Sequence, residues 1–501
     1  MKRLNARELI EIVVDEGSWR SWDTEPVVPA AGIDEAYAAD LARARESSGV
    51  DEAVLTGEGT VKGRRVAVVA CEFKFLAGSI GVAAAERLVQ AIERATVEGL
   101  PLLAGTASGG TRMQEGTTAF LSMVKISAAV AAHREAGLPF LVYLRHPTTG
   151  GVFASWGSQG HLTVAEPGAL IGFLGPRVYE ALYHSSFPEN VQTGENLHRR
   201  GLIDAVIPPE RIPAIVDRAL NVLLGARELP SLPVRPDYRP VADQDAWEAI
   251  QRSRKAERPG VRELLRHAAR DVLPLNGTGQ GEKDPGLLLA LARFGDAPCI
   301  VLGQDRRSQA RHHPMGPAAL REGRRGMRLA SELGLPLVTV IDTPGAALSK
   351  EAEEGGLAGE IARSLSDLVT INAPTVSLIL GEGSGGGALA LIPADVVLSA
   401  ENGWLSPLPP EGASAIVHRD TDHAPELARR QGVKAMDLKD AGIVDHIIEE
   451  HPGGEGDAAD EPVEFSRRVG HWLEYEVIRL MRQPATVRYH GRLAKYRRLG
   501  L

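Results

Sequence analysis

Two glycine-rich stretches contain the residue types that can stabilise a developing negative charge. Thr148-Thr149-Gly150-Gly151-Val152 follows a strand-like apolar run, and Ser384-Gly385-Gly386-Gly387-Ala388 follows another. Glycine lets the backbone approach a ligand closely, and consecutive N–H groups at the start of a helix can point at one oxygen. Each stretch therefore predicts an oxyanion hole that consists of backbone N–H groups and requires no side chain.

A third glycine-rich stretch, Ser108–Gly116, lies between a predicted strand and a predicted helix. Free N–H groups at a helix start favour a phosphate or an oxyanion, and an arginine can pair with a phosphate through two hydrogen bonds. An ordinary tight turn would have the same spacing. We expect this stretch to bind substrate through Ser108, Gly109, Gly110 and Arg112.

The glycine-rich stretches belong to a long internal duplication. Leu100-Pro101-Leu102 recurs as Leu335-Pro336-Leu337, which lies 235 positions later. Because Gly and Pro fix backbone geometry, a shared set of these residues indicates a shared set of turns. The period is too long for a solenoid repeat and indicates two whole domains with equivalent sites. The same offset relates Gly81 to Gly316, Gly110 to Gly345, Leu138-Pro139 to Ala373-Pro374, Gly150-Gly151 to Gly385-Gly386, and Glu166-Pro167-Gly168 to Glu401-Asn402-Gly403.

Predicted strands and helices alternate in both halves, which favours an α/β layered fold. Residues 1–55 are charged and helical in pattern, and we expect them to form an arm before the first domain. In the first half we expect strands at 66–71, 100–105, 140–144, 162–166 and 169–173, helices at 81–98 and 117–136, and a short helix from Gly150 through Trp156. In the second half we expect strands at 299–302, 337–342, 375–380 and 396–399, and helices at 316–333, 357–369 and 386–392.

Residues 228–243 contain four prolines (Pro230, Pro233, Pro236 and Pro240), which predicts a linker between the halves. The predicted domains are therefore residues 1–228 and 229–501. The C-terminal segment 488–501 is basic. It is either a solvated face or a contact for an acidic partner or for CoA phosphates.

The composition excludes several classes of protein. A chain of 501 residues is too long for one hydrophobic core, and a net charge of −9 does not favour nucleic acid as a partner. Two cysteines are too few for a disulfide framework or a zinc ribbon, so we expect no metal. The N-terminus has no signal-peptide pattern and no uncharged apolar run reaches about 18 residues, so we expect a cytoplasmic protein.

Three other motifs fail on inspection. Asp342-Thr343-Pro344-Gly345 resembles a GTPase switch, but the chain has no Gly-x4-Gly-Lys-Ser/Thr loop. Ser384 cannot form a nucleophile elbow because Glu382 stands where that motif requires glycine. Lys434-Ala435-Met436 has the letters of a biotin-attachment site in the wrong order.

Longer motifs around these turns resemble the carboxyltransferase subunits of acetyl-CoA carboxylase. The first half resembles the β subunit, and the second half is similar to the α subunit. The resemblance covers roughly residues 50–225 and 290–450 and suggests a fused subunit of actinobacterial type. The matching stretches are Ser108–Gly116, Thr149–Ser155, Ala165–Phe173 and Gly175–Arg177 in the first half, and Asp342–Ala346, Gly381–Leu389, Pro410–Ser414, Asp437-Leu438 and Gly442–Asp445 in the second.

This resemblance implies two tandem crotonase-like (ClpP-like) domains of ββα units. It implies carboxyl transfer from biotin, carried on a separate protein, to the α-carbon of acetyl-CoA or propionyl-CoA, which gives malonyl- or methylmalonyl-CoA. Gly150 and Gly151 would serve the thioester, Gly386 and Gly387 would serve biotin, and Leu389 would contact the acyl chain. The implied partners are a biotin carboxylase or carrier subunit and a second copy, in a dimer or a dimer-based hexamer.

The resemblance further implies an active site where the first domain of one chain meets the second domain of its partner. The family's four-cysteine zinc finger is missing, so zinc is not expected. Ala347-Leu348-Ser349 replaces the usual Tyr-Pro-Gly and leaves open a non-catalytic structural subunit. An acyl-CoA decarboxylase also stays open, whereas a hydratase would need paired glutamates and Glu115 stands alone.

Overall fold

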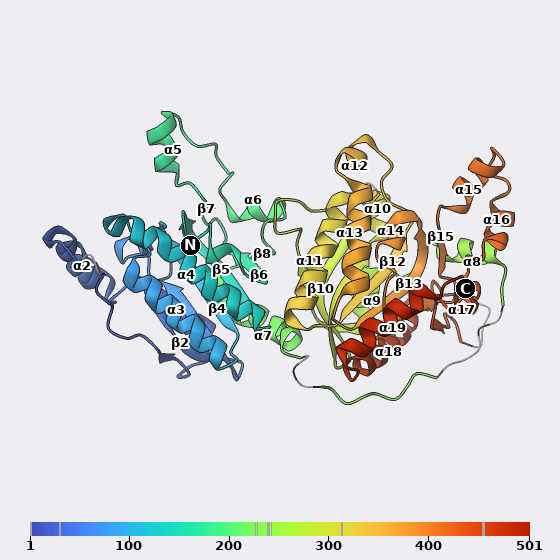
Figure 1. The fold of residues 1–501 in the computed structure, drawn as a ribbon, viewed down its shortest axis with the longest axis horizontal. Helices are drawn as coiled ribbons and strands as arrows, with labels where there is room; N and C mark the ends of the chain where they lie inside the picture. Colours follow the sequence, from blue (N-terminus) through green and yellow to red (C-terminus); the bar gives the residue numbers. More distant parts are fainter. Residues whose placement is uncertain are drawn as a thin grey trace. The chain divides into compact units, whose positions relative to one another are not determined.

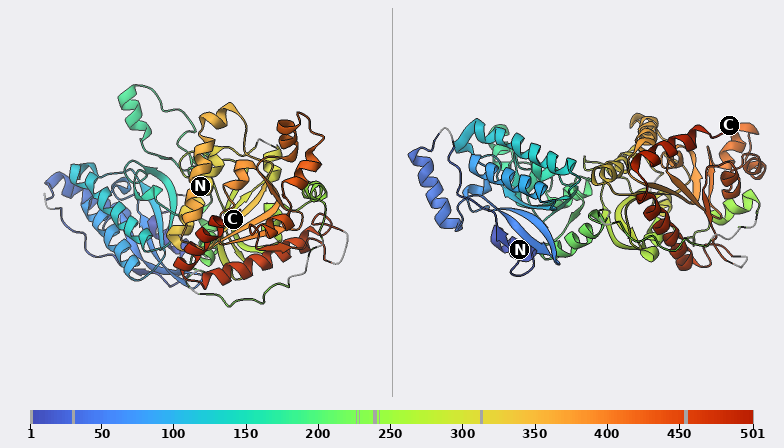
Figure 2. Two further views of the ribbon diagram at one scale, coloured as in Figure 1. Left: turned by 45° about the vertical axis from the view of Figure 1, so that its right-hand side comes forward. Right: turned by 60° about the horizontal axis from the view of Figure 1, so that its bottom comes forward.

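The computed structural model describes residues 3–29, 32–225, 227, 229–237, 241, 243–311, 314–452 and 456–500. The chain forms two compact units, Met1–Leu220 with Gly279–Gly281, and Asn221–Thr278 with Glu282–Leu501. Within the described residues, each unit contains one eight-stranded sheet with helices on its faces (Figures 1 and 2). None of the helices in this described part is long and apolar enough to cross a membrane.

The sheet of the first unit has the order β1-β2-β3-β4-β5-β6-β8, with β7 paired to β5. Helices α3 and α4 cover one face and pack against each other, whereas α1 and α7 cover the opposite face. The strands are β1 (Arg20–Ser21), β2 (Val54–Val61), β3 (Arg64–Cys71), β4 (Leu102–Ser108), β5 (Phe140–Thr149), β6 (Leu162–Ala165), β7 (Ile171–Gly172) and β8 (Ala205–Val206). The helices are α1 (Ala6–Val13), α2 (Glu35–Ser48), α3 (Val82–Val97), α4 (Gly116–Glu135), α5 (Pro176–Tyr183), α6 (Gly194–Arg199) and α7 (Ile212–Leu223).

The sheet of the second unit has the order β16-β14-β13-β12-β11-β10-β9, with β15 paired to β13. Helices α9 and α18 pack with the sheet in one apolar cluster, and α11 packs against α13. The strands are β9 (Ala269–Leu275), β10 (Leu287–Phe294), β11 (Ala297–Gln304), β12 (Leu337–Thr343), β13 (Thr375–Ser384), β14 (Val396–Ala400), β15 (Trp404–Ser406) and β16 (His446–Ile448). The helices are α8 (Ala246–Ser253), α9 (Val261–Ala268), α10 (Arg306–Arg311), α11 (Pro317–Leu333), α12 (Lys350–Glu354), α13 (Leu357–Thr370), α14 (Gly385–Leu389), α15 (Pro410–Val417), α16 (Ala424–Arg430), α17 (Ala435–Asp440), α18 (Pro462–Met481) and α19 (Ala485–Arg497).

The duplication predicted from the sequence is confirmed in the central strands of the two sheets. Leu102 pairs with Phe140 in the first sheet, and Leu337 pairs with Thr375 in the second, at the same offset of 235. Both parallel ladders shift register at equivalent places, just before Ser108 and just before Thr343. The central strands of the two sheets therefore end in the same way, which places the two glycine turns at equivalent positions.

Three expectations about the elements need correction. The first glycine turn is not followed by the predicted helix through Trp156. The carbonyl of Val152 accepts from the N–H groups of both Ser155 and Gly157, so the chain forms successive turns there. A 3-10 helix follows at Trp156–Ser158. The charged arm is helical only in part, since it also contributes β1 and leads into β2. Strand β8 of the first sheet and strands β9, β10, β15 and β16 of the second were not predicted.

The predicted linker runs without regular structure where it is described, and Pro240 lies outside the described residues. The basic C-terminal segment is solvated only in part, since Arg497 and Arg498 are exposed whereas Arg488 and Arg492 are buried. It forms α19, in which Arg492 is fully buried and donates to the carbonyl of Ile371 at 2.7 Å and to Asp395. Because the last carbonyls of a helix lack partners within it, Arg492 caps the C-terminal end of α13.

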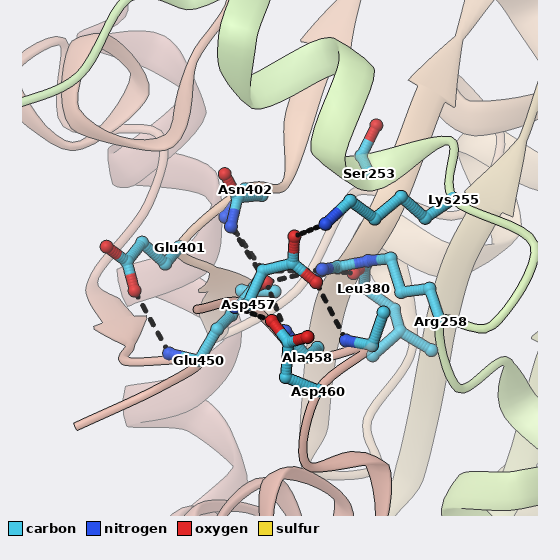
Figure 3. Close-up of polar contacts among 12 residues, drawn as sticks. Ser253, Lys255, Arg258, Leu380, Glu401, Asn402, Glu450, Asp457, Ala458 and Asp460 are labelled. Atoms are coloured by element: carbon cyan, nitrogen blue, oxygen red, sulfur yellow. Dashed lines mark hydrogen bonds and ion pairs between the residues drawn. The ribbon is translucent and has the colours of Figure 1, made fainter. Parts of the chain in front are cut away.

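A buried polar cluster joins the segment before α9 to the loops after β14 and β16 (Figure 3). Arg258 pairs with Glu450, and both side chains are almost completely buried. Glu450 also accepts from the backbone N–H of Asn402 at 2.8 Å, while Lys255 pairs with Asp457 at 2.6 Å. Burial acts to raise the pKa of Glu450, but the Arg258 guanidinium and these donors outweigh it and hold that pKa below its usual value.

Candidate functional site

The first glycine turn is formed by two chain segments that touch at their glycines. Gly110 follows β4 with a φ of 109°, and Gly150 follows β5 with a φ of 64°. A Cβ atom on Gly150 would lie 3.2 Å from the Cα atom of Gly110, so the two backbones pass too closely for larger residues. Ser108 closes the first segment, because its buried hydroxyl accepts from the N–H of Gly110 at 3.0 Å.

The N–H groups of this turn have different partners. Gly150 donates to the carbonyl of Phe173 at 2.9 Å, and Gly109 donates to the carbonyl of Ala77 at the same distance. Within the described residues, no acceptor meets the N–H of Gly151, which is only partly buried. The N–H of Gly150 therefore holds the turn closed, whereas that of Gly151 is left available. The use of Gly150 and Gly151 as oxyanion donors stays a prediction.

Arg112 lies directly after this turn and is almost completely buried. Its guanidinium pairs with Glu52 and donates to the carbonyl of Ser79 at 2.7 Å and to the hydroxyl of Tyr37 at 3.2 Å. The predicted contact between Arg112 and a phosphate would require these contacts to break. Arg112 therefore anchors the turn to the N-terminal arm, which contributes Tyr37 and Glu52. Neither partner stands in a motif or at a spacing that sequence analysis could have recognised.

Glu115 completes this buried group from the other side. Its carboxylate accepts from the Tyr37 hydroxyl and from the backbone N–H of Val82 at 2.5 Å. Val82 is the first residue of α3, where N–H groups lack partners and negative charge is stabilised. Glu115 is therefore engaged in capping a helix, which removes the single glutamate available to a hydratase at this turn.

The second glycine turn repeats the backbone of the first. Gly345 has a φ of 133° and Gly385 has a φ of 64°. Thr343 occupies the position of Ser108, and its hydroxyl accepts from the N–H of Gly345 at 3.1 Å. Both turns thus have a hydroxyl, a first glycine and a second glycine in the same relation, as the offset of 235 predicts.

Helix α14 begins at this second turn and presents its first N–H groups. The N–H groups of Gly386 and Gly387 have no acceptor among the residues that the structure describes, as expected in the first turn of a helix. A Cβ atom on Gly386 would lie 2.6 Å from Cδ1 of Ile361, and one on Gly387 would lie 3.1 Å from Cε of Met315. Glycine at both positions therefore keeps the backbone open at the point where the free N–H groups emerge.

Two carboxylates lie beneath the second turn. Asp342 accepts from the N–H of Glu382 at 3.2 Å and has Arg306 at 3.7 Å, while Glu382 binds Arg254 at 3.0 Å. Burial raises the pKa of both carboxyl groups, and the neighbouring arginines oppose that shift. Both side chains are more than nine-tenths buried, so they support the turn and do not face a ligand. The sequence interpretation missed this pair.

Exposed apolar side chains surround both turns. Leu389, predicted to contact the acyl chain, is 48% exposed on α14, and Leu348 is 93% exposed beside the second turn. Met113, at the position equivalent to Leu348, is 82% exposed, and Phe120 and Val124 of α4 are also exposed. Apolar patches of this kind mark surfaces that bind partners or ligands.

The arrangement can stabilise negative charge on two different oxygens, one at each turn. It contains no exposed acid–base pair among the residues described above. No group of three or more His, Cys, Asp or Glu side chains among the described residues could hold a metal ion. The chemistry available at each turn is therefore that of backbone N–H donors.

Comparisons with known proteins identify the family. A carboxyl transferase domain model matches residues 2–489. The chain is 60% identical over 501 residues to a probable biotin-dependent acyl-coenzyme A carboxylase beta3 subunit of Mycobacterium tuberculosis, covering 100% of this chain and 99% of that protein. It is 36% identical to the acetyl-coenzyme A carboxylase carboxyl transferase subunits beta/alpha of Salinispora arenicola, over 99% of this chain and 91% of that protein.

Solved structures agree on the fold. Transcarboxylase 12S, with methylmalonyl-coenzyme A and methylmalonic acid bound, matches with a TM-score of 0.72 at 20% identity, over 94% of this chain and 89% of that chain. A single-chain, multi-domain long-chain acyl-CoA carboxylase matches with a TM-score of 0.69 at 18% identity, over 89% of this chain and 45% of that chain. The predicted pair of crotonase-like domains is confirmed, and the chain belongs to the carboxyl transferase family, as a carboxyltransferase subunit of the biotin-dependent acyl-CoA carboxylase type.

Proposed function

We propose that this subunit moves a carboxyl group from carboxybiotin, carried on a separate protein, to the α-carbon of acetyl-CoA or propionyl-CoA. The observation that carries this proposal is the pair of equivalent turns, each with N–H groups that have no acceptor in the described part of the chain. The first domain, residues 1–228, would hold the acyl-CoA, and the second, residues 229–501, would hold biotin. Leu389 would contact the acyl chain through its exposed side chain.

The residues of each turn fit the oxygen that each half must stabilise. The N–H of Gly151 would donate to the thioester oxygen, where negative charge gathers as the α-proton leaves. The N–H groups of Gly386 and Gly387 would donate to the ureido oxygen of biotin. When bound, carboxybiotin supplies the carboxyl group and the acceptor for the α-proton, which is why no side-chain base is required. Loss of one such donor costs about 3 kcal/mol of barrier.

We further propose that two copies of this chain form the active unit, as a dimer or a dimer-based hexamer. The exposed apolar side chains around both turns support this assembly, since Met113, Phe120 and Leu348 would lose contact with water in it. Static light scattering tests the proposal. A monomer that retains full carboxyltransferase activity would refute it.

The proposed reaction is tested by supplying a carboxylated biotin carrier with acetyl-, propionyl- or butyryl-CoA and identifying the products by mass. We expect transfer to the shorter acyl groups. Streptavidin blotting of the purified chain should be blank, because biotin is carried by the partner. A folded protein that transfers carboxyl groups to none of these substrates would favour the structural-subunit alternative, for which Ala347-Leu348-Ser349 is the specific observation.

The reverse reaction, removal of a carboxyl group from malonyl- or methylmalonyl-CoA, would use the same donors. Free biotin or the uncarboxylated carrier would then accept the carboxyl group. Comparing the two directions at equal substrate concentrations separates a carboxylase subunit from a decarboxylase.

A further inference from the structure

We propose that Gln304 is a positioning residue for the biotin-side turn. Its side chain sets the orientation of α14, and with it the direction of the Gly386 and Gly387 N–H groups. The inference rests on the proposed function, since it assigns to Gln304 the support of donors that the proposed reaction uses.

Gln304 is the last residue of β11 and is completely buried. Its amide nitrogen donates to the carbonyl of Gly387 at 2.8 Å. Its amide oxygen accepts from the backbone N–H of Asp342, in β12, at 3.2 Å. One planar amide therefore joins the neighbouring strand to the first turn of α14.

This bridge matters because α14 is only five residues long. A helix of this length is not stable by itself, and its orientation depends on contacts with its surroundings. Fixing the carbonyl of Gly387 fixes the adjacent peptide plane, and the N–H groups of Gly386 and Gly387 turn with that helix. Because the bridge is buried, losing it leaves a carbonyl and an N–H without partners.

A second amide supports the same turn. Gln309 accepts from the Thr343 hydroxyl at 2.8 Å and donates to the carbonyl of Gly286 at 3.0 Å. Thr343 in turn contacts the N–H of Gly345. Both sides of the second turn, Gly345 and Gly387, are thus held by buried glutamine side chains.

The first unit has no such bridge at the equivalent place. Ala67 of β3 pairs with Leu102, and Ile300 of β11 pairs with the equivalent residue Leu337, so Ala67 is equivalent to Ile300. Four residues further along each strand, Cys71 is therefore equivalent to Gln304. A thiol cannot donate and accept across two segments as an amide does. Gln304 is therefore specific to the second turn and is not a general requirement of the duplicated fold.

The test compares Gln304→Met with a matched control, Thr375→Val. Methionine has a similar length and removes both hydrogen bonds. The control removes the buried contact between Thr375 and Asp395, at the opposite end of β13 from the turn. Carboxyl transfer should fall about tenfold or more in Gln304→Met, with an unchanged KM for acyl-CoA, because small displacements of reacting groups are costly. Thr375→Val should lower Tm and keep the parent's kcat.

Gln304→Glu supplies a readout that a merely structural role would not produce. A neutral carboxylic acid at this place can donate to Gly387 and accept from Asp342, whereas its ionised form cannot donate. Burial raises the pKa of such a group. The turnover of this variant relative to the parent should therefore increase several-fold as the pH is lowered from 8 towards 5.5, while the same ratio for Gln304→Met stays flat.

Backbone hydrogen exchange tests the positioning without any substrate. The peptide spanning residues 382–391 should exchange faster in Gln304→Met than in the parent, and the peptide spanning 147–156 should not change. Parent-like kcat together with parent-like exchange in residues 382–391 would overturn the inference. If the parent itself transfers no carboxyl group, the proposed reaction fails, and exchange alone decides whether Gln304 orients α14.

Discussion

The two glycine turns have the same backbone but are held in place by different chemistry. The first is anchored by charge, since Arg112 after the turn pairs with Glu52 of the N-terminal arm. At the equivalent position of the second turn stands Ala347, whose N–H donates to Met315 as that of Arg112 donates to Ile80. The second turn is anchored by the amides of Gln304 and Gln309.

The helices that lead to the turns differ in the same manner. Arg87 of α3 binds Asp51 of the arm at 2.7 Å, whereas Glu322, at the equivalent position of α11, accepts from the N–H of Gly277 at 3.1 Å. Glycine and strand register are thus shared by the two turns, while the anchors around them differ between the two halves. The Ala347-Leu348-Ser349 departure therefore alters the surroundings of the second turn and leaves its backbone intact.

The charged anchor of the first turn should give the largest effect. Arg112→Met leaves Glu52 buried without its partner and should lower the free energy of unfolding by about 3–5 kcal/mol. Ala347→Ser, at the equivalent position of the second unit, should alter the free energy of unfolding by no more than about 0.5 kcal/mol. Chemical denaturation measures both, and replacing Glu52 and Arg112 together by Met should recover part of the loss. Equal losses of unfolding free energy at positions 112 and 347 would show that the two turns are not anchored differently.

The donors themselves should have the next largest effect. Gly386→Pro and Gly151→Pro each remove one N–H and should each slow carboxyl transfer by about a hundredfold. Proline is tolerated in the first turn of a helix, which limits the damage at Gly386. Turnover is measured beside Tm. If only one of the two variants loses turnover while both stay folded, the turns are not equivalent in function.

Alanine is the control for these proline variants, because it keeps the N–H. Gly386→Ala needs a companion change, Ile361→Val, since the new methyl group would meet Cδ1 of Ile361 at 2.6 Å. The new methyl group of Gly151→Ala would have Thr111 and Met123 as its nearest neighbours, at 3.2 Å or more. Both alanine variants should retain more activity than their proline counterparts.

The pH dependence of stability should distinguish α11 from α3. Burial raises the pKa of Glu322 to about 7, so the folded protein retains a proton that the unfolded chain loses above its ordinary pKa of 4.5. This contribution to stability is complete below pH 4.5 and is lost as the pH rises to about 7. Glu322→Gln should therefore match the parent near pH 4.5 and be more stable by roughly 3 kcal/mol at pH 8.

Arg87→Met is the matched variant for that experiment. Arginine keeps its charge across this range, so the variant should be destabilised by a similar amount at pH 5 and at pH 8. Thermal melts at several pH values measure both. A Glu322→Gln variant whose advantage does not depend on pH would show that Glu322 is already ionised in the folded protein.

The smallest expected effect concerns the hydroxyls that close the turns. The Thr343 hydroxyl contacts both Gly345 and Gln309, whereas the Ser108 hydroxyl contacts Gly110 alone. Thr343→Val should therefore cost about 1 kcal/mol more than Ser108→Ala. A double-mutant cycle of Thr343→Val with Gln309→Leu measures the coupling energy between the two side chains, and we expect it to account for that difference. A coupling near zero would mean that the amide does not support this turn.

The duplication, the alternation of strands and helices, and the positions of both glycine turns could be predicted from the amino-acid sequence. Those features are local: a positive φ at Gly110, Gly150, Gly345 or Gly385 favours glycine whatever surrounds it. The offset of 235 then predicted, from each turn in one half, the position of the equivalent turn in the other half. The central parallel strands and the long helices that cover them followed from periodicity in the same way, whereas the core strand β10 did not.

The contacts that the groups of each turn make became known only from the folded structure. The N–H of Gly150 donates to the carbonyl of Phe173, and the guanidinium of Arg112 pairs with Glu52, which lies 60 positions away in the chain. Gln304 likewise meets Gly387 across 83 positions. Hydrogen bonds of this kind depend on which segments the fold brings together, and they leave no periodic pattern in the sequence. The positions of the turns are therefore encoded locally, but their free donors and their anchors arise only when distant segments pack.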